Sequence, residues 1–288
     1  MKPQFIDLST FTEDNGFYQE IKLLITIKSF DLQSIRQRYL ANRNKKSNRT
    51  GSVHRRESAT GGIAELTLKN GEIRNLQILT KLKEPRGVDS FGNITAFSSE
   101  NQVHILSGNR HKILTNPWFS YIHTVEINTS SHDHILVSSS GFDCIFEYSI
   151  SDLRKTFEWF AWENGFNAGV DPETTEKILL TRNQHIAEQY AKEGKNHVFI
   201  SDPASQVLPT AKRAAFINSV VYDPYTKENI IATFFHEGAV YEINRISGKT
   251  IRVLDGLKNP HGGMKTGSDH YVATSTKSGE VVEGYRDN

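Results

Sequence analysis

Histidines supply the clearest candidate chemistry in this sequence. The stretch GLKNPHGGMKTG (256–267) sets His261 after Pro260 and before two glycines, where a short strand is predicted to begin. Proline restricts the backbone that leads to His261, and the glycines let neighbouring chains approach closely. An imidazole exchanges protons near neutral pH and can also ligate a metal. His261 is therefore a candidate site residue if the fold places it at a cleft.

Four segments share one pattern: a polar residue, an apolar strand start, a turn rich in Asp, Gly, Ser or Asn, and a second alternating strand. They are EPRGVDSFGNITAFSS (84–99), YIHTVEINTSSHDHILVSSS (121–140), FINSVVYDPYTKENIIATFF (216–235) and NPHGGMKTGSDHYVATS (259–275). With Val170 filling the gap, the equivalent positions recur every 37–50 residues; they are Val88, Val125, Val170, Val220 and Gly263. A unit of this length with four short strands is typical of a propeller blade.

We therefore predict an all-β fold, a β-propeller of about six four-stranded blades around a central channel, with five or seven blades as alternatives. The chain 1–288 would form a single domain. The first blade would use residues 21–30 and 61–79, and an N-terminal strand at 5–10 would complete the last blade and close the ring. Residues 152–167 would form an outer strand and loop, and 181–197 a short inserted helix.

The phrases EPRGVD, FINSVVYDP, GAVYEINRISGKTIRVLDGL and NPHGG resemble repeats of the NHL, gluconolactonase/regucalcin and strictosidine-synthase-like propellers. The resemblance covers most of residues 61–288. It implies a fold that hosts hydrolases, lyases, condensing enzymes and binding modules. In the calcium-dependent members a Glu, an Asp and several Asn side chains converge on the axis. Here Asn218 matches that pattern, but Arg86, His123 and His261 depart from it, which argues against calcium-lactonase chemistry.

Propeller geometry brings the residues before each inner strand to one mouth of the channel. These entrance residues are Arg86, His123, Asn167, Asn218 and His261. The loops between second and third strands open on the same face. We predict a site at this mouth, with His123, His236 and His261 as the catalytic candidates. The predicted substrate-binding residues are Arg86, Asn218, Asp143, Glu237 and Arg182.

Two kinds of chemistry fit these residue types. His123, His236 and His261 could together hold one divalent metal (zinc, iron or calcium) on the axis. Without a metal, His123 or His261 would act as a general acid or base while Arg86 binds a carboxylate, sulfate or phosphate. The third interpretation is that the side chains hydrogen-bond to one another and fill the channel.

The segment 34–62 is predicted to be a basic, flexible insertion within the first blade. Between Arg36 and Glu57 it has eight Lys or Arg and one acidic residue, which leaves a net charge of about −6 on the rest of the chain. It is too polar to form a core of its own. By alignment it replaces a loop at the same mouth, so it is a solvated loop, a cationic lid over an anionic substrate, or a docking arm.

The composition limits the class of function. A net charge of +1 gives no global attraction to nucleic acid, and the lone Cys144 excludes an intrachain disulfide and fits a reducing compartment. No apolar run is long enough to cross a membrane. We expect a cytoplasmic enzyme of hydrolase, lyase or cyclising type that acts on a polar or anionic small molecule. The alternative is a non-catalytic propeller that binds a peptide, glycan or protein. The oligomeric state is left open.

Overall fold

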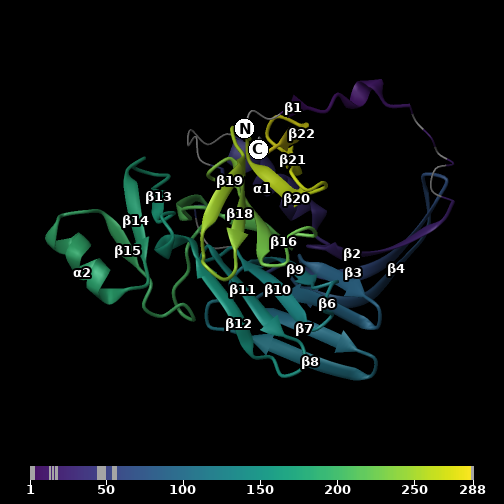
Figure 1. The fold of residues 1–288 in the computed structure, drawn as a ribbon, viewed down its shortest axis with the longest axis horizontal. Helices are drawn as coiled ribbons and strands as arrows, with labels where there is room; N and C mark the ends of the chain where they lie inside the picture. The colour runs from purple at the N-terminus through teal and green to yellow at the C-terminus, as the bar shows by residue number, and fades with distance from the viewer. Residues whose placement is uncertain are drawn as a thin grey trace.

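The protein folds into six β-sheets. The structure is a computed structural model that describes residues 4–12, 14, 16, 19–43, 50–53 and 57–286. Four of the sheets have four strands and two have three (Figure 1). Every strand pair is antiparallel except that of β14 with β15. The all-β propeller predicted from the repeats is the fold observed.

Three sheets are regular four-stranded meanders, each formed by consecutive strands. The first contains β5 (Val88–Phe91), β6 (Ile94–Ser99), β7 (Gln102–Ser107) and β8 (Arg110–Thr115). The second contains β9 (Ile122–Ile127), β10 (His134–Ser139), β11 (Cys144–Ser149) and β12 (Lys155–Phe160). The third contains β16 (Ile217–Tyr222), β17 (Asn229–Phe234), β18 (Ala239–Asn244) and β19 (Thr250–Leu254).

The last sheet is assembled from both ends of the chain. The last sheet has β20 (Pro260–Lys265), β21 (His270–Ser275) and β22 (Glu280–Tyr285), and the N-terminal strand β1 (Gln4–Phe5) pairs with β22. A short helix η1 (Leu8–Thr10) follows β1. The first sheet has β2 (Ile21–Ile27), β3 (Thr60–Lys69) and β4 (Glu72–Lys83). An N-terminal strand therefore completes the last sheet as predicted, but it is Gln4–Phe5, and Leu8–Thr10 of the predicted strand form a 3-10 helix instead.

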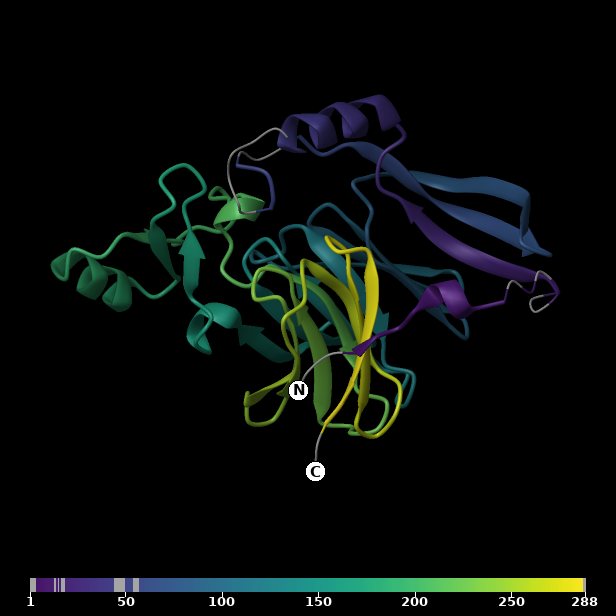
Figure 2. The same ribbon diagram turned by 90° about the horizontal axis from the view of Figure 1, so that it is seen from above.

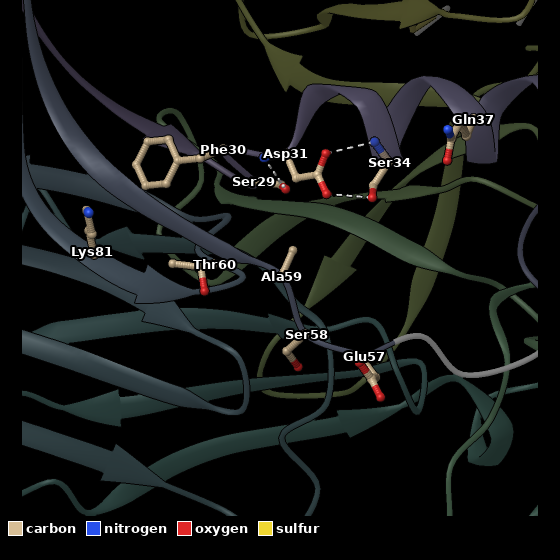
Figure 3. A pocket seen from close by; sticks show the side chains of 10 residues that line it. All are labelled: Ser29, Phe30, Asp31, Ser34, Gln37, Glu57, Ser58, Ala59, Thr60 and Lys81. Carbon is tan, nitrogen blue, oxygen red and sulfur yellow. Dashed lines mark hydrogen bonds between the residues drawn. The ribbon is translucent and has the colours of Figure 1, made fainter.

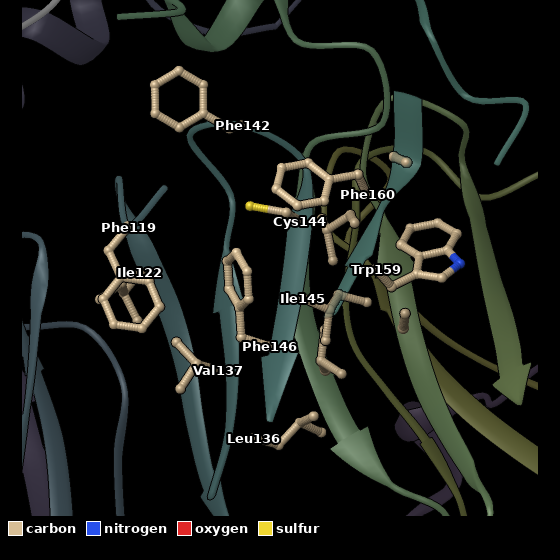
Figure 4. Close-up of a cluster of buried hydrophobic side chains, with 14 of the residues drawn as sticks. Phe119, Ile122, Leu136, Val137, Phe142, Cys144, Ile145, Phe146, Trp159 and Phe160 are labelled. Carbon is tan, nitrogen blue, oxygen red and sulfur yellow. The ribbon is translucent and has the colours of Figure 1, made fainter. Parts of the chain in front are cut away.

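The main core lies between the β9–β12 and β16–β19 sheets. Every residue of β11 and of β17 is buried, because both strands are covered on their two faces. Aromatic side chains fill this region, among them Phe119, Phe142, Phe146, Trp159 and Phe160 (Figure 4). Cys144 is buried in the same cluster.

Inner strands of successive sheets pack against one another. β9 packs on β5 and β6, β16 packs on β9 and β10, and β20 packs on β16 and β17. The β9–β12 and β16–β19 sheets are thus direct neighbours. Thr124 exchanges hydrogen bonds with Val220, and the Oγ of Ser140 donates to the carbonyl of Ile217.

The sheet around Val170 lies outside this row of inner strands. It has β13 (Ala168–Val170), β14 (Lys177–Thr181) and β15 (His197–Phe199), and α2 (Gln184–Lys192) is inserted between β14 and β15. Figures 1 and 2 show it to one side of the other sheets. The 3-10 helices η2 (Ala161–Glu163) and η3 (Thr210–Lys212) flank it. The helix predicted in 181–197 is confirmed.

The predicted insertion connects β2 to β3. Its first part is the helix α1 (Leu32–Arg43), where the sequence predicted a loop. The carboxylate of Asp31 accepts a hydrogen bond from the Ser34 amide and the Asp31 carbonyl accepts from the Ile35 amide, which is N-cap geometry. Part of the insertion, residues 44–49 and 54–56, lies outside the described residues. No described helix is long and apolar enough to span a membrane.

Candidate functional site

The entrance residues of the inner strands are held by one repeated backbone turn. Two positions before each of them, a non-glycine residue adopts the left-handed conformation: Glu84 (φ 41°), Tyr121 (φ 51°), Phe216 (φ 49°) and Asn259 (φ 54°). The residues they precede are Arg86, His123, Asn218 and His261. Such conformations cost free energy for residues with a Cβ, and they cluster at sites that need a fixed side-chain direction.

Arg86 and His123 bond directly. The Nη1 of Arg86 lies 3.0 Å from the Nε2 of His123, and its Nη2 pairs with the Glu84 carboxylate at 2.6 Å. The Nδ1 of His123 lies 3.3 Å from the Tyr121 carbonyl. Because a carbonyl only accepts, Nδ1 carries the proton and Nε2 accepts from Arg86. Burial, together with the positive charges of Arg86 and Arg213, holds the pKa of His123 well below its ordinary value. His123 is therefore neutral at pH 7.

Asn218 links the inner strand β16 to the inner strand β20. Its side-chain amide donates to the carbonyl of Pro260 at 2.8 Å, directly before His261. Asn218 is 3% exposed, and its Oδ1 has no hydrogen-bond partner among the described residues. The Nε of Arg86 is the other buried polar atom of these entrance residues without such a partner. Unpaired buried polar atoms are uncommon and call for a ligand or water.

His261 repeats the geometry of His123 without an arginine. Its Nδ1 lies 3.2 Å from the Asn259 carbonyl, which places the proton on Nδ1. Its Nε2 makes no hydrogen bond with any described residue. Burial lowers the pKa of His261 below the ordinary value, so the ring is neutral at pH 7 and Nε2 has a lone pair to accept a proton.

The three predicted histidines border one pair of phenyl rings. Phe216 contacts His123 at 5.4 Å and His236 at 5.5 Å between ring centroids. Phe235 contacts Phe216 at 4.8 Å, His236 at 5.3 Å and His261 at 5.3 Å. The Nε2 of His236 lies 2.9 Å from the Thr210 carbonyl. The structure thus brings these three imidazoles together around the Phe216 and Phe235 rings.

This arrangement does not suit a metal. Among the described residues, no three His, Cys, Asp or Glu side chains are close enough to hold one ion. The imidazoles of His123, His236 and His261 pack against the phenyl rings of Phe216 and Phe235. The geometry favours the metal-free alternative.

Three other predicted residues have partners other than the histidines. Asp143 is fully buried; its carboxylate accepts from the amides of Ala214, Ala215 and Phe216 and from the Trp162 indole at 3.4 Å. Burial raises the pKa of Asp143. Arg182 pairs with Glu163 at 2.7 Å and lies over the Phe160 ring, and Glu237 lies 3.7 Å from Arg252. All three side chains are thus engaged with other protein groups in this structure, and their role in substrate binding stays a prediction.

Sequence reasoning missed several residues of the mouth. Arg213 is 1% exposed and lies over the rings of Tyr121 (4.6 Å) and Phe216 (5.1 Å). Burial lowers its pKa to about 10. Tyr121 also contacts Arg86 at 5.3 Å, so two guanidinium groups share one ring. The position two residues before each entrance residue would have pointed to Tyr121 and Phe216. No sequence signal marks Arg213.

The insertion reaches across this end of the molecule. The Ala211 amide donates to the Ser52 carbonyl, and the Asn259 side chain donates to Thr50 at 2.9 Å. Asn259 holds His261, so residues 50–53 lie beside the site. A cavity of about 960 Å³ lies between α1 and the start of β3 (Figure 3). Its lining residues are Ser29, Phe30, Asp31, Ser34, Gln37, Glu57, Ser58, Ala59, Thr60 and Lys81. None of the histidines lines it.

Comparisons with known proteins bear on the fold alone. No family model and no curated protein matches the chain. A chain of the mitotic checkpoint complex has a TM-score of 0.49 at 10% identity, over 82% of this chain and 62% of that one. Catalytically inactive virginiamycin B lyase from Staphylococcus aureus with quinupristin has 0.41 at 9%, over 85% and 82%. The Cps50 (Swd1) β-propeller domain from Myceliophteria thermophila has 0.42 at 11%, over 79% and 67%.

These structures resemble the chain in fold, at low sequence identity. The chain spans less than two thirds of the mitotic checkpoint chain. All three TM-scores lie below 0.5, so the likenesses carry no argument about activity. The resemblance to NHL-like propellers seen in the sequence likewise extends to the fold and no further.

Proposed function

We propose that this protein is an enzyme that binds a small anionic molecule at the mouth formed by Arg86, His123, Asn218 and His261. His261 is the general base, and Arg86 binds the carboxylate, sulfate or phosphate of the substrate. The reaction is a hydrolysis or an elimination, in which the Nε2 of His261 accepts a proton from water or from a carbon next to an activating group. The observation that carries the proposal is the neutral His261, whose Nε2 makes no hydrogen bond with a described residue, beside Asn218, whose side chain donates to the Pro260 carbonyl.

His123 has a different role from His261 in this proposal. Its Nε2 already accepts from Arg86, so it fixes the guanidinium by a hydrogen bond and is a positioning residue. Glu84 holds a second nitrogen of the same group. These contacts use the two Nη atoms of Arg86, so its Nε, which has no hydrogen-bond partner among the described residues, would donate to the substrate. Arginine suits this purpose because its planar fork matches oxyanion geometry.

The test is a screen followed by a pH profile. The purified protein is incubated with a panel of lactones, esters and sulfated or carboxylated cyclic compounds, and the products are detected by mass spectrometry. His261→Ala should lower kcat by roughly 10²–10⁴-fold, the usual range for loss of a general base. His270→Ala is the matched control, since His270 pairs with Glu283 on another part of β21 and β22.

The pH dependence follows from the direction of the pKa shift. A general base must be deprotonated, and the pKa of free His261 lies below 6.5. We expect kcat/KM to rise with pH through a value under 6.5 and to stay level above it. Turnover that is unchanged in His261→Ala would refute the assignment.

A second function is favoured by the position of the cavity. The 960 Å³ cavity lies beside α1, and none of its lining residues is a histidine. A ligand bound there would not contact the candidate catalytic residues. In that case a ligand would stabilise the protein in thermal melts without any product being formed. Lys81→Ala would then weaken ligand binding, whereas His261→Ala would not.

A further inference from the structure

The cavity between α1 and the start of β3 is lined mainly by polar side chains (Figure 3). Of its ten described lining residues, eight are polar or charged, and Phe30 and Ala59 are the two apolar ones. Its volume of about 960 Å³ lies in the range of about 300–1,000 Å³ that is usual for small-molecule sites. Burying a polar group costs free energy unless it is hydrogen-bonded, so a ligand here must form hydrogen bonds over most of its surface. A lipid-like ligand does not fit this lining.

The charges of the cavity favour a neutral ligand. Asp31 and Glu57 are its carboxylates, and Lys81 is the one cation among the described lining residues. The two carboxylate oxygens of Asp31 already accept from the amide (2.9 Å) and the hydroxyl (2.6 Å) of Ser34. One carboxylate, Glu57, and one ammonium, Lys81, are then left for a ligand, and their charges cancel. Asp31 adds a negative charge nearby, which repels an anion.

Four of the lining side chains have hydrogen-bonding groups to offer; they are Gln37, Glu57, Thr60 and Lys81. None of them makes a side-chain hydrogen bond or an ion pair with a described residue, and we call them the four unpaired side chains. The ammonium donates, the carboxylate accepts, and the amide and the hydroxyl do both. A sugar hydroxyl is donor and acceptor at once, so it can pair with every one of these groups.

Phe30 gives the cavity an aromatic surface. Its ring packs beside Gly62 of β3, where a Cβ would lie only 3.0 Å from the ring Cζ. Phe30 is nevertheless 40% exposed, so part of the ring is left for a ligand. A sugar ring has an apolar C–H face that packs on an aromatic ring while its hydroxyls point outward to polar groups. The combination of one phenyl ring with planar polar side chains therefore suits a sugar.

The walls of the cavity are held in place before any ligand binds. The Phe30 amide donates to the Thr60 carbonyl at 3.0 Å, which ties the start of the insertion to its end. The Ser58 hydroxyl donates to the Glu100 carboxylate at 2.6 Å, which ties the same segment to the turn between β6 and β7. A site that is already formed loses less free energy to ordering when a ligand binds.

We propose that this cavity binds a neutral carbohydrate of more than one sugar unit. One ring packs on Phe30, and the hydroxyls are hydrogen-bonded by the four unpaired side chains. More than one unit is needed because Phe30 and Lys81 lie at one end of the cavity while Gln37 and Glu57 lie toward the other (Figure 3). The inference rests on the second function given above, ligand binding without catalysis at this cavity, and it is independent of the histidines.

The test is isothermal titration calorimetry with four neutral disaccharides: maltose, cellobiose, lactose and N,N′-diacetylchitobiose. At least one should bind saturably, with a Kd on the order of 1 mM or below. Gln37→Ala removes an amide from the exposed side of α1, and Phe30→Leu removes the aromatic ring but keeps an apolar side chain beside Gly62. Each should raise the Kd at least about threefold. Gln33→Ala, on the same helix outside the lining, is the matched control and should leave the Kd unchanged.

Thermal melts of each variant show whether it is folded, so that a lost fold is not taken for a lost contact. Wild-type protein that binds none of the four disaccharides would overturn the proposal, as would a Kd that is the same in Gln37→Ala, Phe30→Leu and wild type. Citrate and spermidine are the charged probes. If one of them binds in a Gln37-dependent way and the sugars do not, the ligand class is wrong and the second function stands. If no probe binds in a Gln37-dependent way, both fail, while turnover by His261 is measured separately.

Discussion

Four left-handed residues decide where the functional side chains point. Glu84, Tyr121, Phe216 and Asn259 differ in side chain but share a backbone conformation that only glycine adopts without cost. In two of these turns the carbonyl of the left-handed residue lies near the imidazole two positions later, at His123 and at His261. The same turn therefore sets both the direction and the tautomer of each ring. The type of side chain two positions after each turn then decides which chemistry is possible there; these residues are Arg86, His123, Asn218 and His261.

Asp143 should be a stability residue. Its buried carboxylate accepts from three successive amides that lead into β16, so Asp143→Ala leaves three buried donors unpaired. Each such group costs about 1–3 kcal/mol, and we expect a loss of roughly 3–5 kcal/mol in the free energy of unfolding. Urea denaturation measures it. Glu237→Ala, at a partly exposed carboxylate, should change stability by less than about 1 kcal/mol. Equal effects of the two substitutions would contradict this role.

Glu126 should make the protein less stable at alkaline pH. Burial, with a smaller contribution from the charge of Asp89, raises its pKa from 4.5 to about 8. The folded state then binds this proton more tightly than the unfolded chain. The stabilisation is complete below about pH 4.5 and is lost as the pH rises through about 8. Glu126→Gln should therefore gain on the order of a few kcal/mol at pH 9 and little at pH 5. A gain that is the same at both pH values would contradict the shift.

At the scale of elements, repeat spacing predicted the strands well. Val88, Val125, Val220 and Gly263 lie in the inner strands β5, β9, β16 and β20, because period-2 alternation and turn residues report directly on strands that are covered on one face. The same turn occurs at Gly165 (φ 89°), two positions before Asn167. There, however, the Asn167 side chain donates to the Tyr190 hydroxyl of α2. A local pattern reports that a strand begins. Which sheet it packs against depends on contacts distant in sequence.

The candidate site could be predicted in part for the same reason. His123, His236 and His261 border the same two phenyl rings, and they could be named as one set from the sequence because turn position is a local property. The phenyl rings among them, the Asp143 contacts and the buried Arg213 arise from packing between sheets. The helix α1 could not be predicted from the sequence, because LQSIRQRYLANR has too few apolar residues to form an apolar helix face.

The insertion should contribute to binding more than to folding. Its described contacts with the body at residues 50–53 are a few polar hydrogen bonds to Ala211, Thr210 and Asn259. Replacing residues 34–57 by a short Gly–Ser linker should shift Tm by no more than a few degrees, since little apolar surface is lost. Affinity for an anionic ligand should fall at least about tenfold, as eight positive charges are removed. An unfolded product would mean that the insertion is part of the core.

At the scale of the whole molecule, the β9–β12 and β16–β19 sheets form the stable centre. Glu147 is buried between them and accepts from Tyr222 at 3.0 Å and from Arg245. These bonds join β11 to β16 and to the end of β18, across 75 and 98 residues of sequence. The fourth sheet along the chain, β13–β15, does not interrupt this junction because it lies outside the row of inner strands.

Local unfolding should follow this division. β13, β14 and β15 have three, five and three residues, and α2 buries only Ala187. Short strands with one covered face open at a lower free-energy cost than strands covered on both faces. In native-state hydrogen exchange, peptides from 168–199 should therefore exchange well before those of β11 and β17, whose residues are all buried. The contrast should persist at low denaturant and vanish near the unfolding midpoint, where all amides exchange through global unfolding. Equal protection of 168–199 and β11 under native conditions would mean that the outlying sheet is an integral blade of the propeller.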